Sequence, residues 1–346
     1  MTLFALDQWR REAWQPQIQA DRCRASAALF DFSFMSVVRL WGLDAASVIS
    51  RYVSRDISQM PPGSIRYCLH SDDSGHVVSD LTVWRLNDQT FDVMSGERQD
   101  AKNLLERADR ETAVEDLSEG TAIFSVQGPM SLAQLLPAYG GDRLKELGYF
   151  CFGDLDIHGI PARVGRLGYT GERGFEIVVD AAFASSLWAS LSGHIEIAGF
   201  AVADILRIEA GFALFCNEFT IGATAKDLAM DCFVDSADNS SIASMSLVCF
   251  TASIRERPVL WQRPQHAASA PEPGELLATS ACFSPLAGSV LGLGYVAKQD
   301  KNTASPLIDP LGNFDEIMLQ QRPFFDPKKR VVLGGWDQRF YPLSAS

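Results

Sequence analysis

Hydrophobic and polar residues alternate along two neighbouring stretches of the chain, and this alternation predicts a β-hairpin. The stretches cover residues 64–69 and 76–84, and a polar turn that contains Gly75 joins them. The other apolar runs have strand or helix periods. Together they predict a mixed α/β protein, with strands at 37–40, 121–127, 151–158, 161–167 and 177–179 and helices at 97–108, 130–137, 182–191 and 201–211.

Asp80 interrupts an otherwise apolar strand pattern. Its neighbours include Val77, Val78 and Leu81, at positions where strands normally have apolar side chains or threonine. A buried carboxylate needs a hydrogen-bonding or ionic partner. The hairpin therefore predicts such a partner for Asp80. The alternative is an aspartate on an edge strand that faces water.

A short turn between two predicted strands combines an aromatic ring with a carboxylate. Residues 169–176 form a glycine-bearing turn with Gly171 and Gly174 and connect the apolar runs 162–167 and 177–179. If the turn folds back on itself, Tyr169 and Glu176 face one cavity, where a flat surface and a hydrogen-bond acceptor suit a flat polar heterocycle. The alternative is an ordinary hairpin with a surface glutamate.

The helix predicted over residues 201–211 contains two charged residues that point in different directions. Arg207 and Glu209 are two positions apart, so they cannot both lie on the solvent face of one helix. We expect one of the two side chains to turn inward.

The character of the sequence changes after Asp235. Residues 236–241 resemble a linker, and later apolar runs predict only strands, near 244–253, 275–280, 289–297 and 314–320. We therefore predict an α/β unit over residues 1–235 and a smaller, β-rich domain over residues 236–346. At the N-terminus, residues 3–19 predict an amphipathic helix.

Composition and charge exclude several classes of protein. The 346 residues are 47% hydrophobic and 21% charged, as in globular proteins. A net charge of −13 disfavours nucleic acid and anionic membranes as partners, and no apolar run is long enough for a membrane helix. The seven cysteines include no C-x-x-C pair, which favours free thiols and a cytoplasmic location. The histidines are too dispersed to predict a metal site.

Several separated segments match one family in the order that the family has them. Together they resemble the aminomethyltransferases, meaning the glycine cleavage system T-protein and its folate-binding relatives among dimethylglycine, sarcosine and demethylase enzymes. The resemblance implies a three-lobed α/β (α+β) protein that binds tetrahydrofolate in a central cavity and is closed by a β-rich C-terminal domain. The matching segments are residues 29–35, 42–45, 62–67, 75–81, 126–129, 169–176, 206–211, 279–285 and 322–327.

The resemblance also implies roles for individual residues. Asp80 matches the carboxylate near the reacting folate nitrogen, and Tyr67 matches an aromatic residue of the pocket. Tyr169, Glu176 and Arg207 match further folate-contacting positions. A pterin offers a flat face to tyrosine and a donor edge to a carboxylate, while arginine supplies fixed donors and a positive charge. Asp80 is then expected to orient the nitrogen and to stabilise the positive charge that develops there.

The sequence departs from the family pattern at the hairpin and after residue 231. The paired acidic residues of the T-protein hairpin are reduced to Ser79 and Asp80, and the usual F-I-G-[KR]-E-A-L segment is missing. The expected function is tetrahydrofolate-dependent transfer of a methyl or methylene group from a small methylated or aminomethyl donor, with a lipoyl-carrying H-protein as a candidate partner. The alternatives are a non-catalytic folate-binding relative of the iron–sulfur assembly factors, whose cysteine signature is missing, and an inactive folate-binding module.

Overall fold

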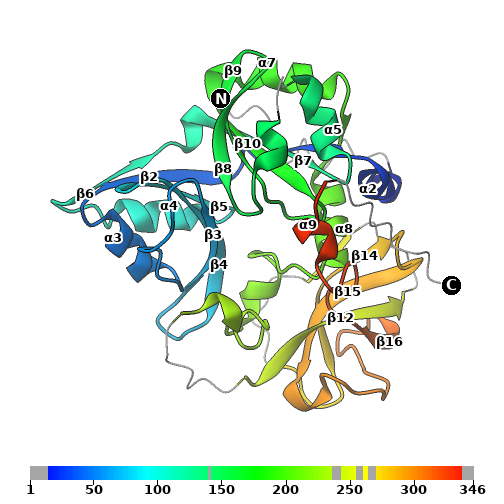
Figure 1. Ribbon diagram of the computed structural model, residues 1–346. Coiled ribbons are helices and arrows are strands. Elements are labelled where there is room, and N and C mark those ends of the chain that lie inside the picture. Colours follow the sequence, from blue (N-terminus) through cyan, green and yellow to red (C-terminus); the bar gives the residue numbers. More distant parts are fainter. Residues whose placement is uncertain (1–14, 139–141, 236–242, 255–259, 264–269, 337–346) are drawn as a thin grey trace.

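The strands of the protein form three sheets, and each sheet is the centre of one lobe (Figure 1). The computed structural model describes residues 15–138, 142–235, 243–254, 260–263 and 270–336. Neighbouring strands pair antiparallel in all three sheets, apart from one parallel pair in the first. The mixed α/β (α+β) class predicted from the sequence is therefore confirmed.

The first sheet has six strands. In spatial order they are β11 (Glu196–Ile197), β1 (Ala28–Asp31), β7 (Thr121–Gln127), β10 (Gly174–Asp180), β9 (Ile160–Gly165) and β8 (Phe152–Ile157). Side chains alternate between its faces, so Phe124 and Ile177 pack with a core on the helix-covered side. Ile123 and Phe30 pack on the other face, in the core of the molecule's centre. Glu176 pairs with Ser125, next to the pair that Ile123 forms with Val178.

The second sheet has five strands and contains the predicted hairpin. In spatial order they are β3 (Ile65–Ser71), β4 (Val77–Asn87), β5 (Thr90–Ser95), β2 (Ser36–Gly42) and β6 (Thr112–Asp116). Leu81 and Val83 pack on one face with the helices, whereas Trp84 packs on the other face with the central core. Asp80 is an even number of residues from Trp84, so its side chain lies on this same central face.

The third sheet closes toward a barrel. In spatial order its strands are β13 (Leu260–Gln262), β14 (Leu276–Ser284), β15 (Ser289–Ala297), β12 (Met245–Ser253) and β16 (Asp315–Gln320). Leu307 bridges to Ile317 of β16, and Ile308 bridges to Glu275 beside β14. These two bridges connect opposite sides of the sheet through one short segment.

Helices cover the outer faces of the first two sheets. The longer ones present apolar residues three or four positions apart, such as Ala45 and Val48 or Ala101 and Leu104 in the second lobe. Among the described residues the α-helices are α2 (Pro16–Ala25), α3 (Ala45–Tyr52), α4 (Arg98–Leu105), α5 (Ser131–Leu135), α6 (Arg143–Glu146), α7 (Ala181–Ser192), α8 (Phe200–Glu209) and α9 (Arg330–Leu333). None of these helices has both the length and the apolar content needed to cross a membrane.

One hydrophobic core joins the three lobes. It combines Phe30 of the first sheet, Trp84 of the second and Leu293 of the third with Leu206 of α8. In Figure 1, α8 lies between the first sheet and the barrel. Residues far apart in the chain are therefore held against one another at the centre of the molecule.

Two sequence expectations fall wholly or partly outside the described residues. The predicted helix at 3–19 overlaps them only from residue 15 onward, where α2 begins at Pro16. The predicted linker at 236–241 lies entirely outside them, so the division at residue 235 remains a prediction.

Candidate functional site

The hairpin of β3 and β4 brings Tyr67 and Asp80 together. Leu69 pairs with Asp80 and Tyr67 pairs with Thr82, which places these side chains on the central face of the second sheet. The hydroxyl of Tyr67 donates a hydrogen bond of 3.0 Å to Oδ2 of Asp80. Because β4 lies between β3 and β5, the interpretation of Asp80 as an edge-strand residue is wrong.

Asp80 is a carboxyl group whose ionisation the protein opposes. Burial raises the pKa of Asp80 from 3.8 to about 6, the hydrogen bond from Tyr67 lowers it, and the nearby charge of Asp100 raises it. Burial also raises the pKa of Tyr67 well above its usual value, with a further contribution from Asp80. Near neutral pH the pair is therefore a carboxylate held by a neutral tyrosine.

The turn before β10 folds around one buried glutamine. Gln127 donates from Nε2 to the carbonyl of Leu167 at 3.0 Å and accepts a hydrogen bond of 3.1 Å from the hydroxyl of Thr170. A Cβ at Gly168 or at Gly174 would lie 2.4 Å or less from this amide group. Glycine is therefore needed on both sides of the turn.

This turn places Tyr169 in the same cluster as Tyr67 and Asp80. The hydroxyl of Tyr169 donates to the carbonyl of Ala213. Its pKa is raised by burial, lowered by the positive charge of Arg207 and raised by the negative charge of Asp80. The structure thus brings three of the five predicted site residues together.

Arg24 of α2 fixes the far side of the turn. Its guanidinium donates to the carbonyl of Thr170 and to Glu172, and it also binds Glu209 of α8, each at 3.0 Å. The same group lies 3.6 Å from the centre of the Phe325 ring. A single arginine in a short helix gave no sequence signal for this contact.

Arg207 is fully buried within the protein. Its guanidinium pairs with Asp204 at 2.5 Å and with Glu218 at 2.8 Å, and it donates to the carbonyl of Phe212 at 3.1 Å. The side chain has no exposed surface, so this geometry gives it a supporting position behind Tyr169. Glu209 is also buried. The expectation that only one of Arg207 and Glu209 turns inward is therefore wrong, because Arg24 provides Glu209 with its own partner.

Glu176 is a buried acceptor without a donor. Its residue is 7% exposed, and among the described residues it has no hydrogen-bonding or ionic partner. Burial alone raises its pKa from 4.5 to about 7. A group that offers hydrogen-bond donors would relieve this burial, as the donor edge of a pterin would.

Glu176 and Asp80 face the same interface between two lobes. Glu176 pairs across the first sheet with Gly165. A Cβ at Gly165 would lie 2.2 Å from the ring of Trp84, which belongs to the same face of β4 as Asp80. The two carboxylates therefore do not open onto opposite outer surfaces. A direct contact between them does not occur among the described interactions.

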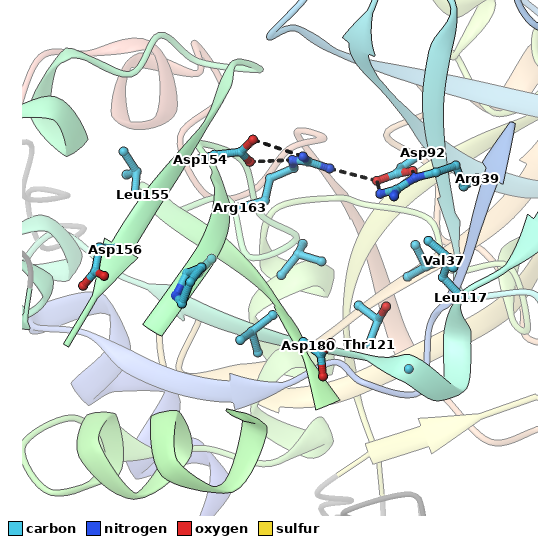
Figure 2. A pocket seen from close by; sticks show the side chains of 15 residues that line it. Val37, Arg39, Asp92, Leu117, Thr121, Asp154, Leu155, Asp156, Arg163 and Asp180 are labelled. Atoms are coloured by element: carbon cyan, nitrogen blue, oxygen red, sulfur yellow. Dashed lines mark hydrogen bonds and ion pairs between the residues drawn. The ribbon is translucent and has the colours of Figure 1, made fainter. Parts of the chain in front are cut away.

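A pocket of about 780 Å³, lined by both apolar and charged residues, opens between the first and second sheets, away from these residues. Figure 2 shows a chain of ion pairs across it, from Asp154 through Arg163 and Asp92 to Arg39. Arg163 binds Asp92 at 2.9 Å and Asp154 at 2.8 Å, and Arg39 binds Asp92 at 2.7 Å. None of the predicted site residues lines this pocket, so it was not predicted from the sequence.

Comparisons with known proteins agree with this architecture. The family described as the GCVT N-terminal domain matches residues 4–238. A probable aminomethyltransferase of Natronomonas pharaonis is 27% identical over 88% of this chain and 89% of its own length. An aminomethyltransferase of Streptomyces avermitilis is 29% identical over 88% of each chain.

A solved structure has the same fold over most of its length. The glycine cleavage system aminomethyltransferase T from Bartonella henselae superimposes with a TM-score of 0.75, is 25% identical and covers 89% of each chain. The match extends over all three lobes, because it exceeds the 4–238 segment of the family domain. The chain therefore belongs to the aminomethyltransferase family, that of the glycine cleavage T-protein.

Proposed function

We propose that this folate-dependent one-carbon transferase binds tetrahydrofolate at the interface between the first two sheets. The observation that supports the site most strongly is Glu176, a buried carboxylate that has no hydrogen-bond donor within the part of the chain that the structure describes. Tyr67 and Tyr169 would offer aromatic surfaces, and Asp80 would face the reacting nitrogen. Arg207 would act indirectly, because its ion pairs fix the segment whose Ala213 carbonyl binds Tyr169.

A reduced folate supplies a nitrogen nucleophile that takes up the one-carbon unit. In the proposed mechanism, ionised Asp80 orients the N–H group and stabilises the positive charge that develops on nitrogen. Tyr67 keeps the carboxylate in one orientation through its hydrogen bond. Holding the one-carbon donor and the folate nitrogen in the reactive orientation lowers the activation barrier by up to about 7 to 11 kcal/mol in well-oriented systems.

We further propose a small methylated or aminomethyl compound as the one-carbon donor. The names of the relatives support an aminomethyl group, and a lipoyl-carrying protein is the partner that would present it. Nothing in the comparisons supports the alternative of an iron–sulfur assembly factor. All seven cysteines are free thiols, which supports a reducing compartment such as the cytoplasm.

Ligand binding is tested by titrating tetrahydrofolate into the protein. The seven tryptophans provide an intrinsic fluorescence signal, and Trp84 lies in the proposed site. We expect a fluorescence change and an increase in thermal stability, since a ligand at about 100 times its Kd adds about 2.7 kcal/mol. An unchanged melting temperature and spectrum at saturating ligand would refute the proposed site.

The role of Asp80 is tested with the Asp80→Asn variant. We expect tetrahydrofolate binding to be retained and turnover to fall about 10²- to 10⁴-fold. The matched control is Asp73→Asn, because Asp73 is an exposed carboxylate in the turn of the same hairpin. Turnover is measured with free methylated amines in one arm and an aminomethylated lipoyl protein in the other. Equal rates for Asp80→Asn and the native protein would exclude Asp80 from the mechanism.

A further inference from the structure

A second carboxylate lies on the opposite side of the sheet from Asp80. Asp100, in the first turn of α4, is 2% exposed. It accepts hydrogen bonds from the hydroxyls of Tyr52, Ser79 and Ser95, and the bond from Ser79 is 2.9 Å. Three donors on one carboxylate compensate the penalty of burying its charge.

Two of these donors connect Asp100 to Asp80. Ser79 precedes Asp80 in β4, and its side chain points to the opposite face of the strand. The hydroxyl of Ser95 lies 3.4 Å from the backbone carbonyl of Asp80 while it donates to Asp100. The backbone around Asp80 is therefore fixed from behind by groups that all bind one carboxylate.

We propose that Asp100 is a positioning residue that fixes the β4 segment around Asp80 and places a second negative charge behind it. The proposal rests on the function proposed for Asp80. The second carboxylate comes from α4 and is joined to the hairpin through the Ser79 hydroxyl.

The surroundings of both carboxylates support an electrostatic coupling between them. Burial is the main cause of the raised pKa of Asp80, and the charge of Asp100 raises it further, against the hydrogen bond from Tyr67. Other titratable or charged groups on the elements packed around the two include Tyr169, Glu218 with its partner Arg207, Tyr52, His70 stacked on Tyr52, Arg107 above the Tyr52 ring, and Arg98 and Lys102 of α4 itself.

The test measures the titration of Asp80 directly in the full-length protein. Aspartate labelled with ¹³C at the side-chain carboxyl gives one NMR signal per residue, and loss of a signal in Asp80→Asn identifies Asp80. In Asp100→Asn the amide oxygen can still accept from Tyr52 and Ser79, while its NH₂ group can donate to Ser95. We expect the Asp80 midpoint to fall by about half a unit to one unit, because a like charge is removed.

Three further variants make the result specific. Asp100→Glu restores the charge and is expected to return the midpoint toward its native value. Ser79→Ala removes a donor from Asp100 but keeps its charge, so the Asp80 midpoint is expected to rise; this variant also serves if Asp100→Asn does not fold. Glu106→Gln removes an exposed charge just after α4 and is expected to change nothing.

The outcome separates this proposal from the proposed function. An Asp80 midpoint that stays the same in a folded Asp100→Asn variant, or in Ser79→Ala, would overturn the role of Asp100. The measurement needs neither folate nor turnover, so failure of tetrahydrofolate to bind would refute the proposed site and leave the titration result standing. In an active enzyme, the acidic limb of the kcat/KM profile should shift with the NMR midpoint, which a purely structural role would not produce.

Discussion

Two carboxylates of the proposed site differ in how the protein treats their charge. Asp80 has a donor in Tyr67, and its pKa reaches about 6. Glu176 has no partner among the described residues, and its pKa reaches about 7. At neutral pH Asp80 is therefore largely ionised, while Glu176 is close to half protonated. Environments that separate the pKa values of neighbouring acids are typical of catalytic sites.

The buried charge of Glu176 should reduce the stability of the folded protein. The ordinary pKa of a glutamate, 4.5, applies in the unfolded chain, whereas the pKa of Glu176 is about 7 in the folded state. The folded protein therefore binds this proton more tightly than the unfolded chain does. Stability is then lost as the pH rises from 4.5 through 7. For Glu176→Gln, we expect the free energy of unfolding relative to the native protein to increase by about 1 to 3 kcal/mol between about pH 5 and pH 8.

Urea denaturation at several pH values measures this difference. The control is Glu119→Gln, which changes an exposed carboxylate in the 3₁₀ turn just before β7. Glu176→Gln should also weaken tetrahydrofolate binding, because an amide offers one acceptor oxygen in place of two. A pH-independent difference in stability would contradict the burial of an uncompensated charge at Glu176.

At the scale of secondary-structure elements, the sequence predicted whether a segment is a helix or a strand better than it predicted where that element begins and ends. The period of two placed both ends of β15 and, to within one residue, the start of β4, which runs three residues past its predicted end; the helical period placed α7 and α8 to within two residues. The predicted helix at 130–137 is instead α5 followed by a 3₁₀ turn that contains Pro137, since proline cannot donate the helical hydrogen bond. Arg207 and Glu209 are both buried because each has ionic partners, Asp204 of the same helix and Glu218 for Arg207 and Arg24 of α2 for Glu209, which a helical period cannot indicate.

Arg24 joins α2 to the turn and to α8, and its loss should destabilise all three. Its side chain is 9% exposed, and those of Glu172 and Glu209 are 4% and 2% exposed. Arg24→Met keeps the apolar stem and leaves two buried carboxylates unpaired. We expect the free energy of unfolding at neutral pH to fall by about 3 to 5 kcal/mol.

Chemical denaturation with Arg22→Met as the control tests this role. Arg22 is in the same helix and pairs with Glu196, but its side chain is 63% exposed, so its loss should cost less than about 1 kcal/mol. The loss of stability caused by Arg24→Met should be smaller at acidic pH. Burial already raises the pKa of Glu172, and protonation of this carboxylate removes its unpaired charge. Equal effects of the two substitutions would argue against the buried network.

At the scale of the whole molecule, the arrangement of the lobes depends on contacts between distant residues. Asp92 binds Arg39 from its own sheet and Arg163 from the first sheet, across 71 positions of the chain. Local periodicity predicts which face of a strand is buried, but not which lobe covers it. The family resemblance, unlike the periodicity, did predict three lobes, and the structure confirms them.

Asp92 is expected to stabilise the contact between the first two lobes. Its side chain is 3% exposed, whereas those of Arg39 and Arg163 are 34% and 19% exposed. In Asp92→Asn the arginines lose a shared anion but keep some access to water. We expect the free energy of unfolding to fall by about 1 to 3 kcal/mol, less than for a fully buried network.

The control for Asp92 is Asp154→Asn at the outer end of the same chain of ion pairs. Asp154 is 70% exposed, so its substitution should change stability by less than about 1 kcal/mol. Guanidinium chloride would screen these charges, so urea is the suitable denaturant. If Asp92→Asn were as mild as Asp154→Asn, the ion pairs across the pocket would not stabilise the lobe interface.

The unpartnered glutamate in β10 also links occupancy of the site to the proton balance of the solution. A bound group that donates hydrogen bonds to Glu176 favours its ionised form and lowers its pKa from about 7. Complex formation near neutral pH then releases a fraction of a proton to the buffer. The heat measured by calorimetry should accordingly vary with the ionisation enthalpy of the buffer chosen, and this variation should vanish in Glu176→Gln.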